Sequence, residues 1–244
     1  MNAIRTLATA GRVLRQLRAD PRSIALMLVA PSLLVGLFSW ILADRQQVFD
    51  QTGPAILVLF PFIVMFLITS VTTLRERRSG TLERLMTTPL GKADFVCGYA
   101  LAFGAAAVVQ AAITTAFAVW VCGLEVAGSL WALGLVAVVD ALLGTTLGLL
   151  ASAFARTEFQ AVQFMPAIVF PQILLGGVIL PREAMPTVLE RISDFLPLSY
   201  AVDAGSAVAS GDPASEIAWP LAVVAACAVC AIVLAAVTLR RRTG

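Results

Sequence analysis

The sequence predicts an all-α polytopic membrane protein with six transmembrane helices, an N-terminal interfacial amphipathic helix, a short cytoplasmic helix and an outer re-entrant helical segment. Hydrophobic residues make up 59% of the 244 residues and charged residues only 13%, whereas a soluble domain carries about 25% charged residues. The charges also cluster between long uncharged runs. A bilayer core of about 30 Å requires roughly 20 apolar residues per helix, and several runs reach that length.

Six such runs are the predicted transmembrane helices. They cover residues 23–43, 54–74, 95–123, 130–155, 161–180 and 217–239. The remaining stretches are too short to form a separate folded domain. Residues 1–244 are therefore predicted to form a single membrane domain, and a soluble motor is expected on another polypeptide.

The basic residues predict which side of the membrane each loop faces. With six spans, fourteen of the seventeen Lys and Arg residues lie on the side of the two termini, and only Arg45, Arg182 and Arg191 lie on the other. Basic residues close to membrane helices are retained in the cytoplasm. Both the N-terminus and the C-terminus are therefore expected in the cytoplasm.

Residues 1–22 are predicted to form an amphipathic helix at the cytoplasmic interface. Leu7 and Leu14 fall on one helical face and Arg12 falls on the opposite face. We expect the arginine face to contact anionic lipid headgroups. Asp20, which precedes a proline, is typical of a helix N-cap, so the first membrane helix is predicted to begin there.

Residues 75–94 connect the second and third spans and predict a two-turn amphipathic helix. Thr81 can cap it, and Leu82, Leu85 and Met86 share one face at spacings i, i+3 and i+4. Two interpretations are open at this point. The apolar ridge could dock a cytoplasmic partner, or the segment could be an ordinary basic loop.

Asp140 lies inside the fourth predicted span. A carboxylate at this depth costs about 2.5 to 3.5 kcal/mol on insertion scales, so it should face protein or water. Gly144 and Gly148 follow at steps of four residues, a pattern that favours close helix packing. Asp140 is therefore predicted at a helix interface, as a structural hydrogen-bonding group, a neutral acid or part of a transport path.

Residues 181–214 follow a fifth span that prolines and glycines interrupt, so a straight helix is not expected there. Val188, Leu189 and Ile192 share one helical face opposite Arg191. This pattern predicts a short amphipathic helix that enters the outer leaflet.

The residue types exclude several kinds of chemistry. The chain has no histidine, the commonest metal ligand, and its four cysteines lie in apolar runs. No metal site, catalytic residue or nucleic-acid partner is expected. The chain also has no G-x-x-x-x-G-K-[ST] phosphate-binding loop, so it is not expected to hydrolyse ATP itself.

Five motifs together carry a family resemblance. They are R-x-D-P-R-S at 18–23, R-E-R-x-x-G-T-L-E-R-L at 75–85, L-G-G-V-I-L-P at 175–181, M-P at 185–186 and F-L-P-L-S-Y at 195–200. The chain resembles the ABC type-2 transporter permeases, and most closely the short permeases of the daunorubicin-resistance type. These are bacterial plasma-membrane subunits of ATP-driven exporters of drugs, polysaccharides and lipids.

The resemblance implies partners and site residues. It implies a second permease subunit, identical or related, and separate nucleotide-binding subunits that hold ATP and magnesium. The helix within residues 75–94 would be the coupling helix that docks on the ATPase, through Arg75, Glu76, Gly80, Thr81, Leu82, Glu83, Leu85 and Met86. Residues 181–214 would close the exit, with an outer gate formed by Pro181, Pro186, Pro197 and Tyr200. A substrate cavity between the two permeases would be lined by Phe60, Phe62, Met65, Phe66, Gln163, Phe164, Phe170 and Gln172.

The predicted function is export of a lipophilic or amphipathic small molecule by alternating access. Membrane lipids are also expected to contact the chain. Export of a lipid, glycolipid or polysaccharide is the alternative within the same class. A proton-coupled carrier that uses Asp140 and a membrane anchor without transport activity are the hypotheses from other classes.

Overall fold

The computed structural model describes residues 3–78 and 91–238. All regular secondary structure in these residues is helical. The long helices are α2 (Pro21–Ile41), α3 (Gln46–Arg78), α5 (Lys92–Trp120), α6 (Leu130–Phe154), α7 (Glu158–Leu175) and α10 (Ala214–Thr238). The shorter ones are α1 (Ala3–Ala19), the 3-10 helix η1 (Arg182–Ala184), α8 (Thr187–Ser193) and α9 (Pro197–Ser210).

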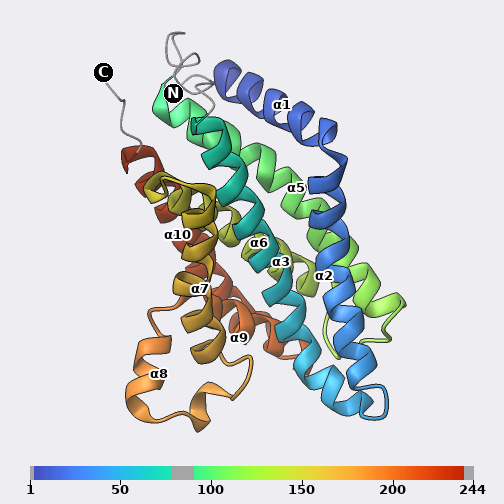
Figure 1. Cartoon of the computed structure of the whole chain (residues 1–244). Coiled ribbons are helices and arrows are strands. Elements are labelled where there is room, and N and C mark those ends of the chain that lie inside the picture. Colours follow the sequence, from blue (N-terminus) through green and yellow to red (C-terminus); the bar gives the residue numbers. More distant parts are fainter. Residues whose placement is uncertain (1–2, 79–90, 239–244) are drawn as a thin grey trace.

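The six long helices are each long and apolar enough to cross a membrane, so the predicted all-α, multi-pass architecture is confirmed. They run alongside one another, with α1 at one end of the bundle and α8 at the other (Figure 1). We call these the α1 end and the α8 end. The last turns of α3 and α10 lie at the α1 end (Figure 1). The α1 end is therefore the end that the basic residues predict to be cytoplasmic.

The second membrane helix is longer than its apolar run. The run covers residues 54–74, whereas α3 contains 33 residues and continues into polar sequence at both of its ends. Helical hydrogen bonds do not require apolar side chains, so a helix can continue beyond the part that contacts hydrocarbon. The charged residues Arg75, Glu76 and Arg77 therefore form the last turn of α3 rather than the start of a loop.

Helix α9 is the element that the sequence pattern did not separate from the outer segment. It begins at Pro197, which suits a first helical turn, and ends before Gly211, whose backbone is left-handed with φ of 76°. Small residues such as Ala201 and Ala204 are fully buried, because they let α9 approach α3, α6 and α10 closely.

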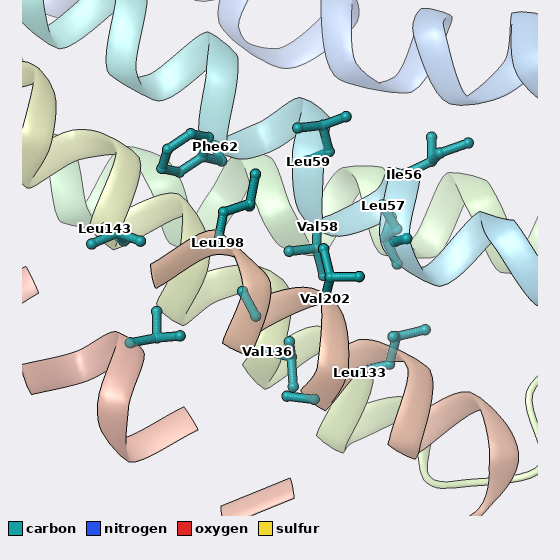
Figure 2. Close-up of a cluster of buried hydrophobic side chains, with 14 of the residues drawn as sticks. Ile56, Leu57, Val58, Leu59, Phe62, Leu133, Val136, Leu143, Leu198 and Val202 are labelled. Atoms are coloured by element: carbon teal, nitrogen blue, oxygen red, sulfur yellow. The ribbon is translucent and has the colours of Figure 1, made fainter. Parts of the chain in front are cut away.

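Helix α3 lies at the centre of the fold, where it packs against α2, α5, α6, α7 and α9. Its Val58 and Phe62 are fully buried. Figure 2 shows these side chains gathered with Val136 of α6 and with Leu198 and Val202 of α9. The core thus joins α3 and α6 to α9.

Candidate functional site

The last turn of α3 is tied by side chains to three other helices. Arg75 donates to both carboxylate oxygens of Glu158 on α7, at 3.2 and 3.1 Å. Arg77 donates to the backbone carbonyl of Ser152 near the end of α6. Glu76 pairs with α1. Movement of this turn would therefore act on α1, α6 and α7 together.

Arg12 of α1 forms the most enclosed of these contacts. Its two terminal nitrogens donate to the two carboxylate oxygens of Glu76 at 3.0 and 3.2 Å, and one also donates to the hydroxyl of Tyr99 on α5 at 3.0 Å. The side chains of Arg12 and Glu76 are only 24% and 14% exposed. We expected Arg12 to face lipid headgroups, and the structure corrects this expectation. An arginine that finds a bidentate carboxylate partner is held by two charge-assisted hydrogen bonds.

Helix α1 also contacts the chain on the far side of residues 79–90. Asp94 accepts from the backbone N–H of Gly91 at 3.2 Å and from the Thr6 hydroxyl at 3.4 Å. A Cβ added to Gly98 would lie 2.6 Å from the Thr9 side chain, so α1 and α5 are in close backbone contact here. Helix α1 therefore contacts both flanks of the predicted coupling segment.

The first two predicted coupling residues thus form ion pairs with other residues of the same chain. Arg75 binds Glu158 and Glu76 binds Arg12. The other six, Gly80, Thr81, Leu82, Glu83, Leu85 and Met86, lie outside the described residues. Arg75 and Glu76 are consequently suited to hold the segment in place.

A cavity of about 190 Å³ lies beside these contacts, between α1, the start of α2, α3 and α5. Leu17 and Phe103 provide apolar walls, and Asp20 and Glu76 provide acidic groups. Asp20 also caps α2, because it accepts from the backbone N–H and the hydroxyl of Ser23 at 3.2 and 2.6 Å. These hydrogen bonds lower the pKa of Asp20 below its ordinary value of 3.8.

The α3–α6 contact contains the two glycines predicted at a helix interface. A Cβ on Gly144 would lie 2.4 Å from the backbone oxygen of Phe62, and one on Gly148 would lie 2.5 Å from that of Phe66. The two backbones therefore touch where both glycines lie. Asp140, one turn earlier on α6, is fully buried, and neither carboxylate oxygen has a hydrogen-bond partner among the described residues.

The eight residues predicted to line a substrate cavity do not come together in a single chain. Phe62, Met65 and Phe66 are fully buried, because α3 is surrounded by other helices. Gln172 is also buried, and its side-chain oxygen accepts from the backbone N–H of Leu198 at 3.3 Å. The members that reach the surface at least in part are Phe60, Gln163, Phe164 and Phe170. Of the eight, these four are the ones whose side chains are accessible at the surface of the single chain.

The predicted outer-gate residues mark the starts of consecutive elements at the α8 end. Pro181 and Pro186 directly precede η1 and α8, and Pro197 is the first residue of α9. The hydroxyl of Tyr200 donates to the backbone carbonyl of Asp194 at 2.9 Å. The three prolines thus lie where these helices begin, and Tyr200 joins α9 to the turn after α8.

Three residues with central contacts were not among those predicted. Tyr99 and Asp94 receive hydrogen bonds from α1, and Arg182 contacts the outer segment at several points. These partners are separated along the chain by up to 88 residues. Residue spacing within a helix gives no signal for such contacts. The one available signal was that Arg182 is among the few basic residues predicted outside.

Comparison with known proteins gives consistent matches. A family model described as ABC-2 type transporter matches residues 5–209. The chain is 30% identical over 177 residues to the probable multidrug ABC transporter permease YbhR of Escherichia coli (strain K12), which covers 71% of this chain and 48% of that protein. It is 27% identical over 160 residues to ABC transporter G family member 20 of Dictyostelium discoideum, covering 66% of this chain and 22% of that one. The chain thus matches less than half the length of these relatives.

Proposed function

The chain belongs to the ABC-2 type transporter family, and from that premise we propose that it is the membrane permease subunit of an ATP-driven exporter. Separate nucleotide-binding subunits would bind ATP and magnesium and dock on the segment around residues 79–90. The permease would pair with a second copy or a related subunit. In this assembly the chain performs no catalysis of its own, and the α1 end faces the cytoplasm.

The observation that carries this proposal is the set of contacts around the predicted docking segment. Glu76 before the segment is bound by Arg12, and Asp94 after it is bound by Thr6. Arg75 joins the same turn to Glu158 of α7. A force applied by a docked ATPase would consequently reach α1, α3, α5 and α7, which is what coupling requires.

The cargo we propose is a lipophilic or amphipathic small molecule. Within the six candidate spans, ionisable groups away from the helix ends are few, and Asp140 is buried. The surface residues that remain candidates for cargo contact are three phenylalanines and Gln163. A binding surface of this kind favours apolar ligands with few polar groups. Export of a lipid, glycolipid or polysaccharide is the second candidate within the same family.

The test is transport by the complex in vesicles containing the chain and its ATPase subunit. We expect a lipophilic dye to be moved only with ATP and to stimulate ATP hydrolysis. Glu83→Ala and Leu85→Ala should abolish stimulation without changing the folding of the permease. If both variants transport and assemble normally, the assigned docking segment is wrong. A parallel assay with a labelled phospholipid decides between the two cargo classes.

The same vesicles test whether α1 belongs to the coupling apparatus. Arg12→Ala should lower dye-stimulated hydrolysis, because it releases α1 from Glu76. Arg15→Ala is the matched control, since Arg15 lies on the same helix and, within residues 3–78 and 91–238, donates only to the backbone carbonyl of Gly11. Equal stimulation in the two variants would show that α1 is not coupled to the ATPase.

Asp140 provides the test against a proton-coupled carrier. That hypothesis requires transport driven by a pH gradient without ATP and abolished by Asp140→Asn. In an ATP-driven exporter, a pH gradient alone should move no dye, and Asp140→Asn should retain ATP-dependent transport.

A further inference from the structure

Arg182 lies at the start of η1 and is largely enclosed, with 13% of its side chain exposed. Its Nε donates to the Ser193 hydroxyl at 2.8 Å. Its two terminal nitrogens donate to the carboxylates of Asp194 and Asp203. The guanidinium also lies over the ring of Tyr200, 5.7 Å from its centroid. One side chain therefore connects η1, the end of α8 and two positions on α9.

We call Arg182, Ser193, Asp194, Tyr200 and Asp203 the Arg182 cluster. Its members also bind one another, since the Tyr200 hydroxyl donates to the Asp194 carbonyl. Arg182 alone contacts all of the other four. Removing it would leave two carboxylates close together without the cation between them, and like charges repel.

The cluster holds a segment with few other attachments. Helix α8 has only seven residues, and isolated helices of that length are unstable in water. Its large side chains Val188, Leu189 and Ile192 are exposed, so apolar packing inside the chain does not hold it. In contrast, α9 is packed into the core through Leu198 and Ala201. The cluster thus joins a weakly attached helix to a firmly attached one.

The chain just before Arg182 is built for a sharp change of direction. Gly177 has a φ of 84°, a left-handed conformation that favours glycine. A Cβ on Gly176 would lie 2.3 Å from the backbone oxygen of Gln172, so the backbone just after α7 lies close against the last turn of that helix. The segment that contains η1 and α8 therefore follows a turn that Gly176 and Gly177 permit.

From these contacts we propose that Arg182 is the positioning residue of the outer gate, holding the C-terminal end of α8 to α9 when the exit is closed. The proposal rests on the proposed export function. Opening of the exit separates Arg182 from Asp194 and Asp203 and lets the C-terminal end of α8 move relative to α9. Charge-assisted hydrogen bonds suit such a closure, because water can replace them at the membrane surface once the segment moves.

The test measures how readily a reagent in water reaches a buried position next to the Arg182 cluster. Ser199 is fully buried, and its hydroxyl donates to the Ser193 carbonyl at 3.0 Å. Ser199→Cys, in a chain whose four native cysteines are replaced by alanine, is labelled with a membrane-impermeant maleimide in the assembled complex. Without ATP we expect slow labelling when Arg182 is present. Arg182→Ala should accelerate it by about tenfold or more, as expected for loss of a charge-assisted hydrogen bond.

Matched variants separate gate positioning from folding. Arg191→Ala removes an exposed arginine from the neighbouring helix α8 and should leave labelling slow. Asp203→Asn keeps the shape of the cluster but removes one charge, and it should accelerate labelling less than Arg182→Ala. Arg182→Lys should restore part of the protection. Asp203→Asn and Arg182→Lys also provide the answer if Arg182→Ala does not fold.

ATP supplies the readout that a purely structural role would not change. In the complex with native Arg182, ATP should accelerate labelling of the introduced cysteine, whereas with Arg182→Ala labelling should be fast with or without ATP while hydrolysis continues. Equal labelling of the Arg182→Ala and Arg191→Ala chains would overturn the positioning role. Absence of any ATP effect with native Arg182, together with absent dye transport, would instead overturn the proposed export function.

Discussion

The close contact between α3 and α6 predicts how much Gly144→Ala lowers the free energy of unfolding. The added Cβ would lie 2.4 Å from the Phe62 backbone oxygen, whereas ordinary contacts begin near 3.4 Å, so the two helices must separate by about 1 Å. A gap of about 0.5–1 Å forfeits a quarter to a half of the dispersion energy of each contact it opens. Forcing extra atoms into a packed interior typically costs about 1–3 kcal/mol.

Gly134→Ala is the matched control because Gly134 lies on the same helix and a Cβ there would meet nothing within 4 Å. Both variants gain the same helix propensity, about 0.8–1 kcal/mol for alanine over glycine. The difference between their free energies of unfolding therefore isolates the interface. We expect Gly144→Ala to be less stable than Gly134→Ala by about 1–3 kcal/mol.

The assay is reversible unfolding of the purified chain in detergent micelles, titrated with a denaturing detergent and followed by circular dichroism. Unfolding free energies that agree within about 0.5 kcal/mol would refute the close approach of α3 and α6, because surface substitutions vary by that amount. Gly148→Ala provides a second measurement at the same interface, with its Cβ 2.5 Å from the Phe66 backbone oxygen.

Three further predictions concern polar contacts, each measured by the same titration. A double-mutant cycle on Arg12 and Glu76 should give a coupling energy of about 1.5–3 kcal/mol, and a value near zero would show that the pair does not form. Hydrogen bonds from Ser23 hold the pKa of Asp20 below 3.8, so the stability from this cap is complete above that pH and is lost as the pH falls through the lower folded-state pKa. Asp20→Ala should remove that part of the acid destabilisation, and an unchanged pH profile would contradict the cap. Gln172→Leu should cost about 1–3 kcal/mol, because it leaves a buried backbone N–H without its acceptor, whereas a neutral effect would mean that water replaces the glutamine.

The fold class and the helix inventory could be predicted because both depend on local composition. A run of about 20 apolar residues identifies a membrane helix wherever it packs, and every predicted run corresponds to a long helix. The exact ends could not be read in the same way, since α3 continues into charged sequence at Arg75. Helix α9 was missed as a separate element because small residues such as Ala204 carry little periodic signal and reveal their role only when packed.

The candidate sites could also be predicted only in part from the sequence. The G-x-x-x-G spacing of Gly144 and Gly148 places both glycines on one helical face, because residues four apart are neighbours on a helix. Which helix they contact depends on the tertiary fold, and it is α3. Likewise, the family resemblance indicated Pro181, Pro186 and Pro197 in the outer segment, but the ion pair of Arg182 with Asp203, which is 21 residues away, appears only in the tertiary structure.

By itself, then, the sequence determined that this protein is a helical membrane protein, where its spans lie, and which family it resembles. Only the tertiary structure decided that Arg12 binds Glu76 rather than lipid headgroups, that Phe62 and Phe66 are buried in the core, and that Arg182 joins α8 to α9. The physical reason is that hydrophobicity and helical periodicity act over a few turns of one helix. Ion pairs and close backbone contacts, by contrast, depend on how whole helices pack against one another.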